Sequence, residues 1–321
     1  MNKKLTKKNT VLMDILPTVK GQYYSFEPLA KKTWFRVGGP AEVLYTPLNL
    51  EDLQNFLKSK PRDVPVTILG RASNLLIRDG GIPGVSIILG SAFNYIRKTD
   101  NTLTCGAYAS SPNVATFCRD NSISGLEFLI GIPGTIGGAL AMNAGAYGSE
   151  ISDITTYAKV LDNRGEIKTI LGNHLQFSYR NCMVPKNTIF VEAGFTGHPG
   201  KKEDIEKIIT DFRNRRLRTQ PVKLRTGGST FQNHENGKAW ELINKAGCHN
   251  LTCGGAHVSK KHCNFLINSA SANANDIEEL GEKIRKIVLQ ETGNNLIWEI
   301  RRIGIKANKI DSLLNLPEVK E

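Results

Sequence analysis

The sequence predicts an α+β protein that is divided into several lobes. A chain of 321 residues with 40% hydrophobic residues can bury a large core, and two or three domains are usual at this length. The opening part alternates short strand-like runs with a helix, as a βαβ unit does. Glycines at positions 197 and 200 then mark a boundary, beyond which helices and strands alternate again. We therefore expect a separate α+β lobe in the C-terminal part.

The opening lobe is expected to begin behind a basic N-terminal segment. Residues 1–20 are basic and aperiodic, so we expect them to be mobile. Asn49 is a favourable N-cap, and Glu51 and Asp52 place negative charge in the first turn of the helix that follows. The elements expected here are strands at 41–45, 64–68 and 85–89 and a helix at 50–58.

The middle of the chain is expected to form a second lobe. Val114, Ala115 and Cys118 share one face of a helix expected over residues 111–121. The strands expected here are 156–161 and 166–170, joined as a hairpin by a turn at 163–165, and 188–195.

A long amphipathic helix opens the C-terminal part. The apolar residues Ile205, Ile208, Ile209 and Phe212 recur at helical spacing within residues 202–218, and Pro221 ends the helix. The elements expected beyond it are a helix at 239–246, a strand at 264–268, a helix at 275–292 that Gly293 stops, and a strand at 296–303.

Two glycine-rich stretches indicate a binding site for a diphosphate. The first, residues 69–77, follows a strand and reads Leu-Gly-Arg-Ala-Ser-Asn-Leu-Leu-Ile. The second, residues 131–148, is crowded with glycine and alanine and almost uncharged. Glycine lets the backbone approach a ligand closely, and exposed amides after a tight turn form an anion site. Tight packing of a small-residue helix explains the second stretch equally well by itself, but two such loops suit a dinucleotide. Neither loop reads Gly-x-Gly-x-x-Gly and no P-loop occurs, so a Rossmann nicotinamide site is not supported.

Charge and aromatic content narrow the classes of partner. The formal net charge of +12 suits an anionic ligand. The basic run at 213–225 is explained either by a solvated helix face or by phosphate-binding groups at a cleft. Aromatic residues make up 7% of the chain and are not interleaved with this run, so a nucleic-acid surface is poorly supported. No apolar run reaches about 18 residues, so no membrane span is expected.

The cysteines are expected to be reduced thiols. The six cysteines are scattered along a long chain, which is typical of cytosolic proteins. Cys248, Cys253, His257 and His262 resemble a zinc set superficially, but the gap between Cys253 and His257 is far shorter than in a zinc finger. We predict no metal.

Three polar residues are candidates for chemistry. Ser229 follows two glycines and is either a turn cap or a hydroxyl presented as a proton donor. Arg180 stands outside any charged cluster and either bridges domains or binds a carboxylate or phosphate. Glu299 lies in an apolar run, where a carboxylate is costly unless it is paired or protonated. Pairing with Arg301 or Arg302 would indicate a structural role, and a raised pKa would indicate a functional one.

Taken as an ordered set, these motifs resemble the UDP-N-acetylenolpyruvoylglucosamine reductase family. The resemblance covers residues 33–304, and it is specific as a set although each motif alone is weak. The matching motifs are residues 33–39, 69–76, 125–148, 179–181, 227–233, 255–268 and 298–300. The short segment after Phe195 and the compact C-terminus resemble the shorter subtype, which lacks an extra substrate-covering insertion.

The resemblance implies a fold. It is an α+β FAD-binding fold of the PCMH or vanillyl-alcohol-oxidase type, in which two α+β lobes hold FAD and a third α+β domain binds substrate. The parts expected on this basis are a mobile N-terminus at 1–20, FAD-binding lobe 1 at 21–84, FAD-binding lobe 2 at 85–200, a substrate-binding domain at 201–306 and a tail at 307–321.

The resemblance also implies which residues act. Ser229 would protonate C2 of the substrate, while Arg180 and Glu299 would stabilise an enolic intermediate. Substrate contacts are implied for Tyr179, Arg180, Asn233 and Asn264. FAD contacts are implied for Gly70, Arg71, Ala72, Ser73, Asn74, Leu75, Pro133, Gly134, Gly137, Gly138, Ala139, Asn143, Gly145, Ala146, Gly148 and Arg216.

The reaction implied by the resemblance is the reduction of UDP-N-acetylglucosamine enolpyruvate to UDP-N-acetylmuramate in peptidoglycan synthesis. NADPH would reduce FAD, and the reduced flavin would give a hydride to C3 of the enolpyruvyl group. We expect small-molecule partners, no nucleic-acid or membrane partner, and a monomer in the bacterial cytoplasm. Two alternatives stay open: a flavin oxidase for another substrate, which would react readily with O2, and a basic binding protein, which would purify colourless.

Two positions depart from the family's pattern. Ala72 stands where a glycine is usual, and its methyl group restricts a backbone with positive φ. His234 follows Asn233 where a proline is usual, which would loosen that turn.

Overall fold

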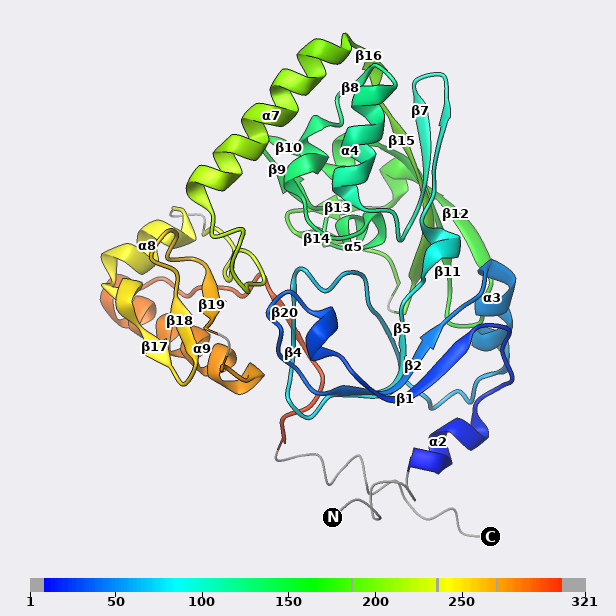
Figure 1. The fold of residues 1–321 in the computed structure, drawn as a ribbon, viewed down its shortest axis with the longest axis horizontal. Coiled ribbons are helices and arrows are strands. Elements are labelled where there is room, and N and C mark those ends of the chain that lie inside the picture. The colour runs from blue at the N-terminus through cyan, green and yellow to red at the C-terminus, as the bar shows by residue number, and fades with distance from the viewer. Residues whose placement is uncertain (1–8, 186, 235–236, 270, 308–321) are drawn as a thin grey trace.

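The structure, a computed structural model, describes residues 9–185, 187–234, 237–269 and 271–307. Figure 1 shows a smaller lobe around helices α8 and α9 beside a larger body that contains the two main sheets. Among the described residues, no helix combines the length and the apolar character that crossing a bilayer requires.

The first lobe is built on a mixed four-stranded sheet in the order β1-β2-β5-β3. Its strands are β1 (Gln22–Pro28), β2 (Pro40–Thr46), β3 (Val66–Ile68) and β5 (Ile82–Ile87). β1 pairs antiparallel with β2, whereas β2 and β3 both pair parallel with β5. Helix α3 (Leu50–Ser59) connects β2 to β3, and Asn49 Oδ1 accepts a hydrogen bond from Asp52 N at 2.9 Å. The predicted βαβ opening and its N-cap are therefore confirmed.

The N-terminal segment differs from the expectation. It contains helix α2 (Asn9–Ile15), and Leu12 of this helix is buried in the same core as Val64. The Asp52 carboxylate accepts hydrogen bonds from the N–H groups of Lys20 and Gly21, at 2.7 and 2.8 Å. The expectation of an aperiodic, mobile segment is thus wrong for residues 9–20, and residues 1–8 lie outside the described residues.

The second lobe carries a five-stranded antiparallel sheet in the order β12-β11-β15-β7-β6. Its strands are β6 (Ile96–Thr99), β7 (Thr102–Gly106), β11 (Thr155–Leu161), β12 (Ile167–Leu171) and β15 (Ile189–Thr196). β11 and β12 form the predicted hairpin. Helix α5 (Ile136–Ala141) contacts β15 and β7, and helix α4 (Ser111–Asp120) contacts the 3-10 helix η3 (Glu127–Gly131). One hydrophobic core runs through both lobes, because Phe56 of the first and Phe195 of the second belong to the same buried cluster.

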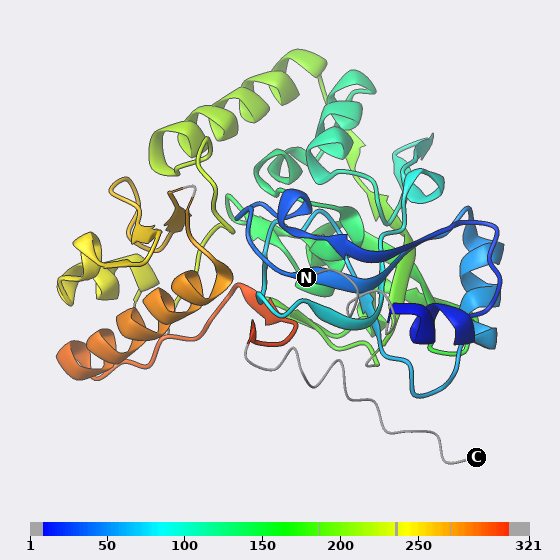
Figure 2. The same cartoon turned by 60° about the horizontal axis from the view of Figure 1, so that its bottom comes forward.

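Helix α7 (Lys202–Thr219) packs on the second lobe. Its buried residues Ile205 and Ile209 join the core that the first two lobes share, and the helix contacts α4 and η3. Figures 1 and 2 both show α7 extending from the second lobe towards the smaller lobe. The predicted domain boundary at residue 201 therefore does not coincide with the packing, in which the third lobe begins after α7.

The third lobe has its own core. A three-stranded sheet, in the order β17-β18-β19, is covered by helix α9, and helix α8 contacts α9. The bounds are α8 (Ala239–Lys245), β17 (Thr252–Cys253), β18 (Ala256–Val258), β19 (Leu266–Asn268) and α9 (Ala274–Thr292). Helix α9 buries a regular apolar face that includes Ile277, Leu280 and Ile284. It stops at Gly293, as predicted, because that residue takes the left-handed conformation with φ 72°.

Short elements connect these units. They are η1 (Ala30–Lys32), β4 (Leu75–Ile77), η2 (Ser91–Phe93), β8 (Ile123–Ser124), β9 (Gly145–Ala146), β10 (Ser149–Glu150), α6 (Ile151–Ile154), η4 (Gly172–His174), β13 (Phe177–Ser178), β14 (Asn181–Cys182), β16 (His198–Pro199), η5 (Cys248–Asn250) and β20 (Arg301–Ile303).

The chain returns to the first lobe at its end. β20 pairs parallel with β4, with Arg301 opposite Leu75 and Ile303 opposite Ile77. The strand predicted at 296–303 is thus confirmed for its last three residues, which belong to the first lobe and not to the third. Figure 2 shows β20, in red, running from the smaller lobe into the larger body.

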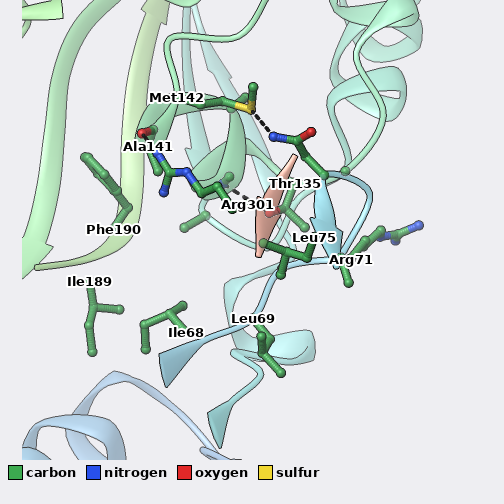
Figure 3. A pocket seen from close by; sticks show the side chains of 18 of the residues that line it. Ile68, Leu69, Arg71, Leu75, Thr135, Ala141, Met142, Ile189, Phe190 and Arg301 are labelled. Carbon is green, nitrogen blue, oxygen red and sulfur yellow. Dashed lines mark hydrogen bonds between the residues drawn. The ribbon is translucent and has the colours of Figure 1, made fainter. Parts of the chain in front are cut away.

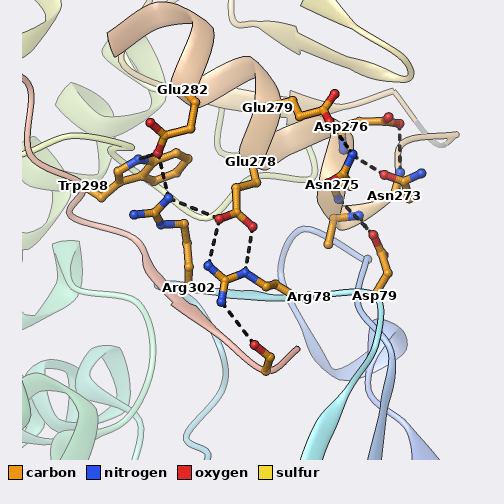
Figure 4. A network of polar contacts seen from close by, with 12 residues as sticks. Arg78, Asp79, Asn273, Asn275, Asp276, Glu278, Glu279, Glu282, Trp298 and Arg302 are labelled. Atoms are coloured by element: carbon orange, nitrogen blue, oxygen red, sulfur yellow. Dashed lines mark hydrogen bonds and ion pairs between the residues drawn. The ribbon is translucent and has the colours of Figure 1, made fainter. Parts of the chain in front are cut away.

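A polar network fastens the third lobe to the first (Figure 4). Arg78 Nε and Nη2 donate to both carboxylate oxygens of Glu278 on α9, at 2.8 and 2.9 Å. Arg302 donates to Glu278 and to Glu282, at 3.2 and 2.7 Å. The Asp79 carboxylate accepts two backbone N–H groups at the N-terminus of α9, each at 2.9 Å. The two lobes are therefore joined by side-chain hydrogen bonds and ion pairs that centre on the buried carboxylate of Glu278.

Candidate active site

The two glycine-rich stretches line one pocket of about 500 Å³ in the larger body (Figure 3). The predicted residues that line it are Gly70, Arg71, Ala72, Ser73, Asn74, Leu75, Pro133, Gly134, Gly137, Gly138 and Ala139. Because these loops are far apart in the sequence, their meeting supports the prediction that both serve one ligand.

Glycines let the two loops touch. A Cβ atom at Gly70 would lie 2.8 Å from Thr135 Oγ1, and one at Gly134 would lie 2.7 Å from Ser73 Oγ. Gly134 also has φ +104°, which side-chain-bearing residues rarely adopt. Ser73 Oγ donates to Pro133 O at 3.2 Å across the contact. Each loop thus uses a glycine to accept a polar side chain of the other.

The first loop keeps its amides available. Within the part of the chain that the structure describes, none of the N–H groups of residues 70–74 donates a hydrogen bond to another residue. Ala72 in this loop has φ +48°, so the methyl group stands at a left-handed position where glycine is favoured. A run of free amides in a tight turn is the arrangement that binds phosphate oxygens.

The pocket suits an anionic, largely apolar ligand. Arg71 and Arg301 line it, and no acidic residue of the described chain does. Figure 3 shows Arg301 directed towards Ala141 and Phe190, with Arg71 pointing away from the other labelled side chains. A Cβ atom at Gly138 would meet only Thr135 Oγ1, at 3.4 Å, so the backbone there faces open space. Apolar walls, free amides and unopposed cations fit the flavin and diphosphate of FAD.

Several implied FAD contacts lie elsewhere. Asn143, Gly145, Ala146, Gly148 and Arg216 do not line the pocket. Gly145 and Ala146 form β9, and Gly148 is exposed. Arg216 Nε donates to Gln220 Oε1 at 3.3 Å, and burial lowers the pKa of its guanidinium. FAD contacts at these five positions stay predictions that pocket geometry does not favour.

The side chain of Asn143 makes structural hydrogen bonds within the second lobe. Its Nδ2 donates to Glu150 Oε1 at 2.8 Å and to Ser178 O at 3.3 Å, and its Oδ1 accepts from Ser152 N at 3.0 Å. The side chain is buried and fully engaged with protein. It therefore holds the β13–β14 hairpin that carries Arg180.

One wall of the pocket was not predicted from the sequence. It is formed by Tyr108, Val184, Pro185, Ile189, Phe190 and Arg301. These residues carry no motif, because apolar side chains at strand ends look alike whether they face a core or a ligand. Only Arg301, two residues after Glu299, lay next to a residue already singled out.

Arg180 and Glu299 form an ion pair. Arg180 Nε lies 3.0 Å from Glu299 Oε1, and 12% of the Glu299 side chain is exposed. The Nε–H group is not aligned for a hydrogen bond, so the attraction at this atom is mainly between the two charges. Burial raises the pKa of Glu299, and the charge of Arg180 opposes this rise without cancelling it. The structural pairing with Arg301 or Arg302 is excluded, and the raised pKa expected of a functional acid is present.

A tight turn presents Arg180. The residue lies between β13 and β14 and has φ 56°, a left-handed conformation that few residues adopt without support. Its guanidinium lies over the ring of Tyr179, with 5.1 Å between the guanidinium carbon and the ring centroid. Tyr179 is itself 52% exposed, so it is accessible to a ligand.

Ser229 is next to the residue that anchors Glu299. Thr230 O accepts a hydrogen bond from Glu299 N at 2.9 Å. Ser229 forms an isolated antiparallel β-bridge with Phe265. Asn264 fixes this segment: its O accepts from Thr230 N at 2.7 Å, and its amide exchanges hydrogen bonds of 2.9 Å with both backbone groups of Phe231. Arg180 thus touches Glu299, and Ser229 precedes the residue whose carbonyl oxygen holds the Glu299 backbone.

The two implied substrate asparagines are engaged with protein. Asn264 is 4% exposed, and its side-chain amide is hydrogen-bonded to the backbone of Phe231. Asn233 is exposed, and its Oδ1 accepts from Ala239 N at 3.2 Å, at the start of α8. The turn after Asn233 closes through two backbone hydrogen bonds between His234 and Gly237, at 3.0 and 3.1 Å. Substrate contacts at both asparagines stay predictions.

The cysteine and histidine cluster forms no ligand set. Among the described residues, no three His, Cys, Asp or Glu side chains converge as metal ligands would. Cys253 Sγ donates to Glu279, and His257 Nδ1 lies 2.7 Å from Ser269 Oγ.

Comparisons with known proteins identify the family of this chain. Residues 41–171 match the FAD binding domain family, and residues 220–303 match the family described as UDP-N-acetylenolpyruvoylglucosamine reductase, C-terminal domain. A reductase of that name from Paramagnetospirillum magneticum is 49% identical over 300 residues, which cover 94% of this chain and 98% of the relative. One from Rickettsia conorii is 48% identical over 292 residues, covering 91% and 99%.

A solved structure supports the fold. The crystal structure of UDP-N-acetylenolpyruvylglucosamine reductase from Thermus caldophilus superposes with a TM-score of 0.77 at 29% sequence identity, and covers 89% of this chain and 99% of the other. The expected α+β FAD-binding fold is thereby confirmed. With relatives this similar over nearly their whole length, the chain belongs to the UDP-N-acetylenolpyruvoylglucosamine reductase family.

Proposed function

We propose that this chain reduces UDP-N-acetylglucosamine enolpyruvate to UDP-N-acetylmuramate beside the Arg180–Glu299 ion pair. The enzyme is a flavoprotein oxidoreductase of peptidoglycan synthesis, with FAD as cofactor and NADPH as reductant. FAD, once reduced by NADPH, supplies the hydride that C3 of the enolpyruvyl group receives. One observation carries the assignment of the site: the segment that holds Glu299 is bonded both to the glycine-lined pocket and to the residue after Ser229.

Arg180 and Glu299 stabilise charge on the substrate. Hydride addition at C3 pushes electrons from the double bond towards the carboxylate that is attached to C2. A fixed guanidinium and a buried acid stabilise that charge best where water is excluded, and both groups here are largely buried. Burial raises the pKa of Glu299, so its carboxyl group keeps a proton to higher pH than an exposed glutamate would, and the protonated form can donate a hydrogen bond.

Ser229 completes the reaction. The electron pair at C2 takes the proton of the Ser229 hydroxyl, which forms the new C–H bond and leaves an alkoxide that solvent reprotonates. Gly228 before it has φ +87° and an added Cβ there would meet nothing within 4 Å, so the turn leaves open space beside Ser229. Tyr179, Asn233 and Asn264 are proposed to hold the sugar nucleotide around this point.

We also propose that the enzyme works as a monomer in the bacterial cytoplasm, without a nucleic-acid partner. Its substrates are soluble small molecules. Light scattering during size-exclusion chromatography tests the oligomeric state, and a mass of twice the chain would contradict it.

The half-reactions test the proposed function. The purified protein is expected to be yellow, to lose its flavin absorbance with NADPH and to recover it with UDP-N-acetylglucosamine enolpyruvate under anaerobic conditions. In Ser229→Ala, reduction by NADPH should survive while reoxidation by substrate falls by about 100-fold or more. Ser91→Ala, an exposed serine outside the pocket, is the matched control and should behave as wild type. Equal loss of both half-reactions in Ser229→Ala would reject the proton-donor role, and rapid reoxidation by O2 alone would favour an oxidase.

A further inference from the structure

We propose that Asn74 is a positioning residue that ties the glycine-lined pocket to Glu299 and so sets where the acid stands, an inference that rests on the proposed function. It was expected only to contact the cofactor, as one residue of a phosphate-binding loop. Its hydrogen bonds instead reach the segment that carries the acid.

The contacts of Asn74 run in both directions along that segment. Its Nδ2 donates to Glu299 O at 3.1 Å, and its own carbonyl oxygen accepts from Arg301 N at 3.1 Å. The same Nδ2 lies 3.7 Å from Met142 Sδ, at the end of the second glycine-rich stretch. Asn74 therefore hydrogen-bonds to the backbone of Glu299 and of Arg301, on either side of residue 300, and also contacts the second glycine-rich stretch.

Glu299 depends on such ties because it lies outside regular structure. Strand β20 begins at Arg301, so no strand ladder holds Glu299 itself. Its N–H donates to Thr230 O at 2.9 Å, its C=O accepts from Asn74, and its carboxylate meets Arg180 at 3.0 Å. Of these three contacts, the hydrogen bond from Asn74 is the one that comes from the loop lining the pocket.

Loss of this tie should matter for chemistry more than for folding. Removing a single side-chain hydrogen bond costs the fold little. A displacement of about 1 Å in a reacting group, however, lowers a rate by about 100-fold. The carboxyl group is also buried, so a shift that lets water in changes its protonation.

The test compares Asn74→Leu, which keeps the size of the side chain and removes the donor, with Ser73→Ala. Ser73 is the neighbour in the same loop and donates to Pro133 O, without a contact to Glu299. In Asn74→Leu holoenzyme we expect FAD to be retained, reduction by NADPH to change by less than about threefold, and reoxidation by substrate to slow by about 10–100-fold. In Ser73→Ala we expect weaker FAD binding and an unchanged ratio of the two half-reactions at saturating FAD.

A second readout follows the acid itself. Carbon-13 NMR of glutamate carboxyl groups, with the Glu299 signal assigned from Glu299→Gln, gives the pKa of Glu299 without turnover. We expect this pKa to fall by about half a unit or more in Asn74→Leu, towards its ordinary value, and to be unchanged in Ser73→Ala. The milder Asn74→Ser, whose hydroxyl is too short to reach Glu299 O, should show the same fall if the leucine variant does not fold.

The outcomes separate the inference from the proposed function. If wild-type protein holds flavin but ignores the sugar nucleotide, the proposed function fails while the NMR titration still decides the role of Asn74. If Asn74→Leu weakens FAD binding as Ser73→Ala does and leaves the pKa of Glu299 and the half-reaction ratio unmoved, Asn74 only binds cofactor and the inference is overturned.

Discussion

Arg180 Nε and Glu299 Oε1 lie 3.0 Å apart although they come from different parts of the fold. The cation belongs to a hairpin turn of the second lobe, whereas the carboxylate belongs to the segment that returns from the third lobe to the first. The ion pair therefore exists only when all three lobes are assembled, which links the chemistry of the site to the architecture.

Glu299→Gln should change the pH dependence of substrate reoxidation. The pKa of Glu299 is raised above its ordinary value of 4.5 by burial, so the neutral form persists to higher pH and the rate falls as pH rises through that pKa. The glutamine side chain can donate a hydrogen bond at every pH, so the variant should not show the fall in rate at high pH. We expect it to keep FAD and to lose less than about 100-fold in the rate of reoxidation. Stopped-flow measurements across pH check this, and a fall that persists in the variant would belong to another group.

Glu278→Ala should destabilise the junction of the third lobe with the first. Two arginines, Arg78 and Arg302, would lose their shared buried carboxylate, which typically costs about 3–5 kcal/mol. Urea denaturation measures the loss. Lys207→Ala, which removes an exposed pair with Asp204, is the control and should change stability by less than about 0.5 kcal/mol. Similar effects of both substitutions would mean that the network contributes nothing special.

Asp52→Asn should release the N-terminal segment at neutral pH. Burial raises the pKa of Asp52, but hydrogen bonds from Leu48 N, Lys20 N, Tyr45 Oη and Gly21 N outweigh it and hold the pKa below 3.8. A carboxyl group whose pKa is lower in the folded than in the unfolded protein stabilises the fold at any pH above its unfolded-state pKa. This contribution is lost as the pH falls through the folded-state pKa. Limited proteolysis at residues 9–20 should therefore be faster in the variant at neutral pH. The difference from wild type should shrink below pH 3.8, and a constant difference would contradict the assignment.

Ala72→Gly should stabilise the protein or leave its stability unchanged. The left-handed backbone at Ala72 costs an alanine about 1 kcal/mol, which glycine avoids, although glycine also gains entropy in the unfolded chain. Ala139→Gly is the matched control: it also lines the pocket but lies in α5, where glycine costs about 1 kcal/mol. Thermal unfolding of the two variants should move in opposite directions, or at least differ by this amount. Equal destabilisation would show that the loop does not hold residue 72 in a strained conformation.

The local elements were predictable because their signals are local. The N-cap at Asn49, the stop at Gly293 and the hairpin around residues 163–165 each depend on a few neighbouring residues, and all three are confirmed. The glycine loops were predictable because glycine is required wherever backbone must approach closely.

What the sequence did not reveal depends on partners far along the chain. The apolar face of α7 showed that Ile205 and Ile209 are buried, but not that the second lobe covers them. Asn143 reads the same in a glycine-rich loop whether it meets a ligand or Ser178. The sequence left open whether Glu299 pairs with Arg301 or Arg302, and its partner is instead Arg180. Strand β1 was missed because it is an edge strand without clear alternation.

The pairing of β20 with β4 has a consequence for biosynthesis. Arg301 and Ile303 form part of the pocket wall, so a nascent chain lacks that wall until these residues have left the ribosome. We therefore expect the vitamin-derived cofactor to be captured only after translation has passed this strand, so that yellow colour marks polypeptides that have been made at least that far.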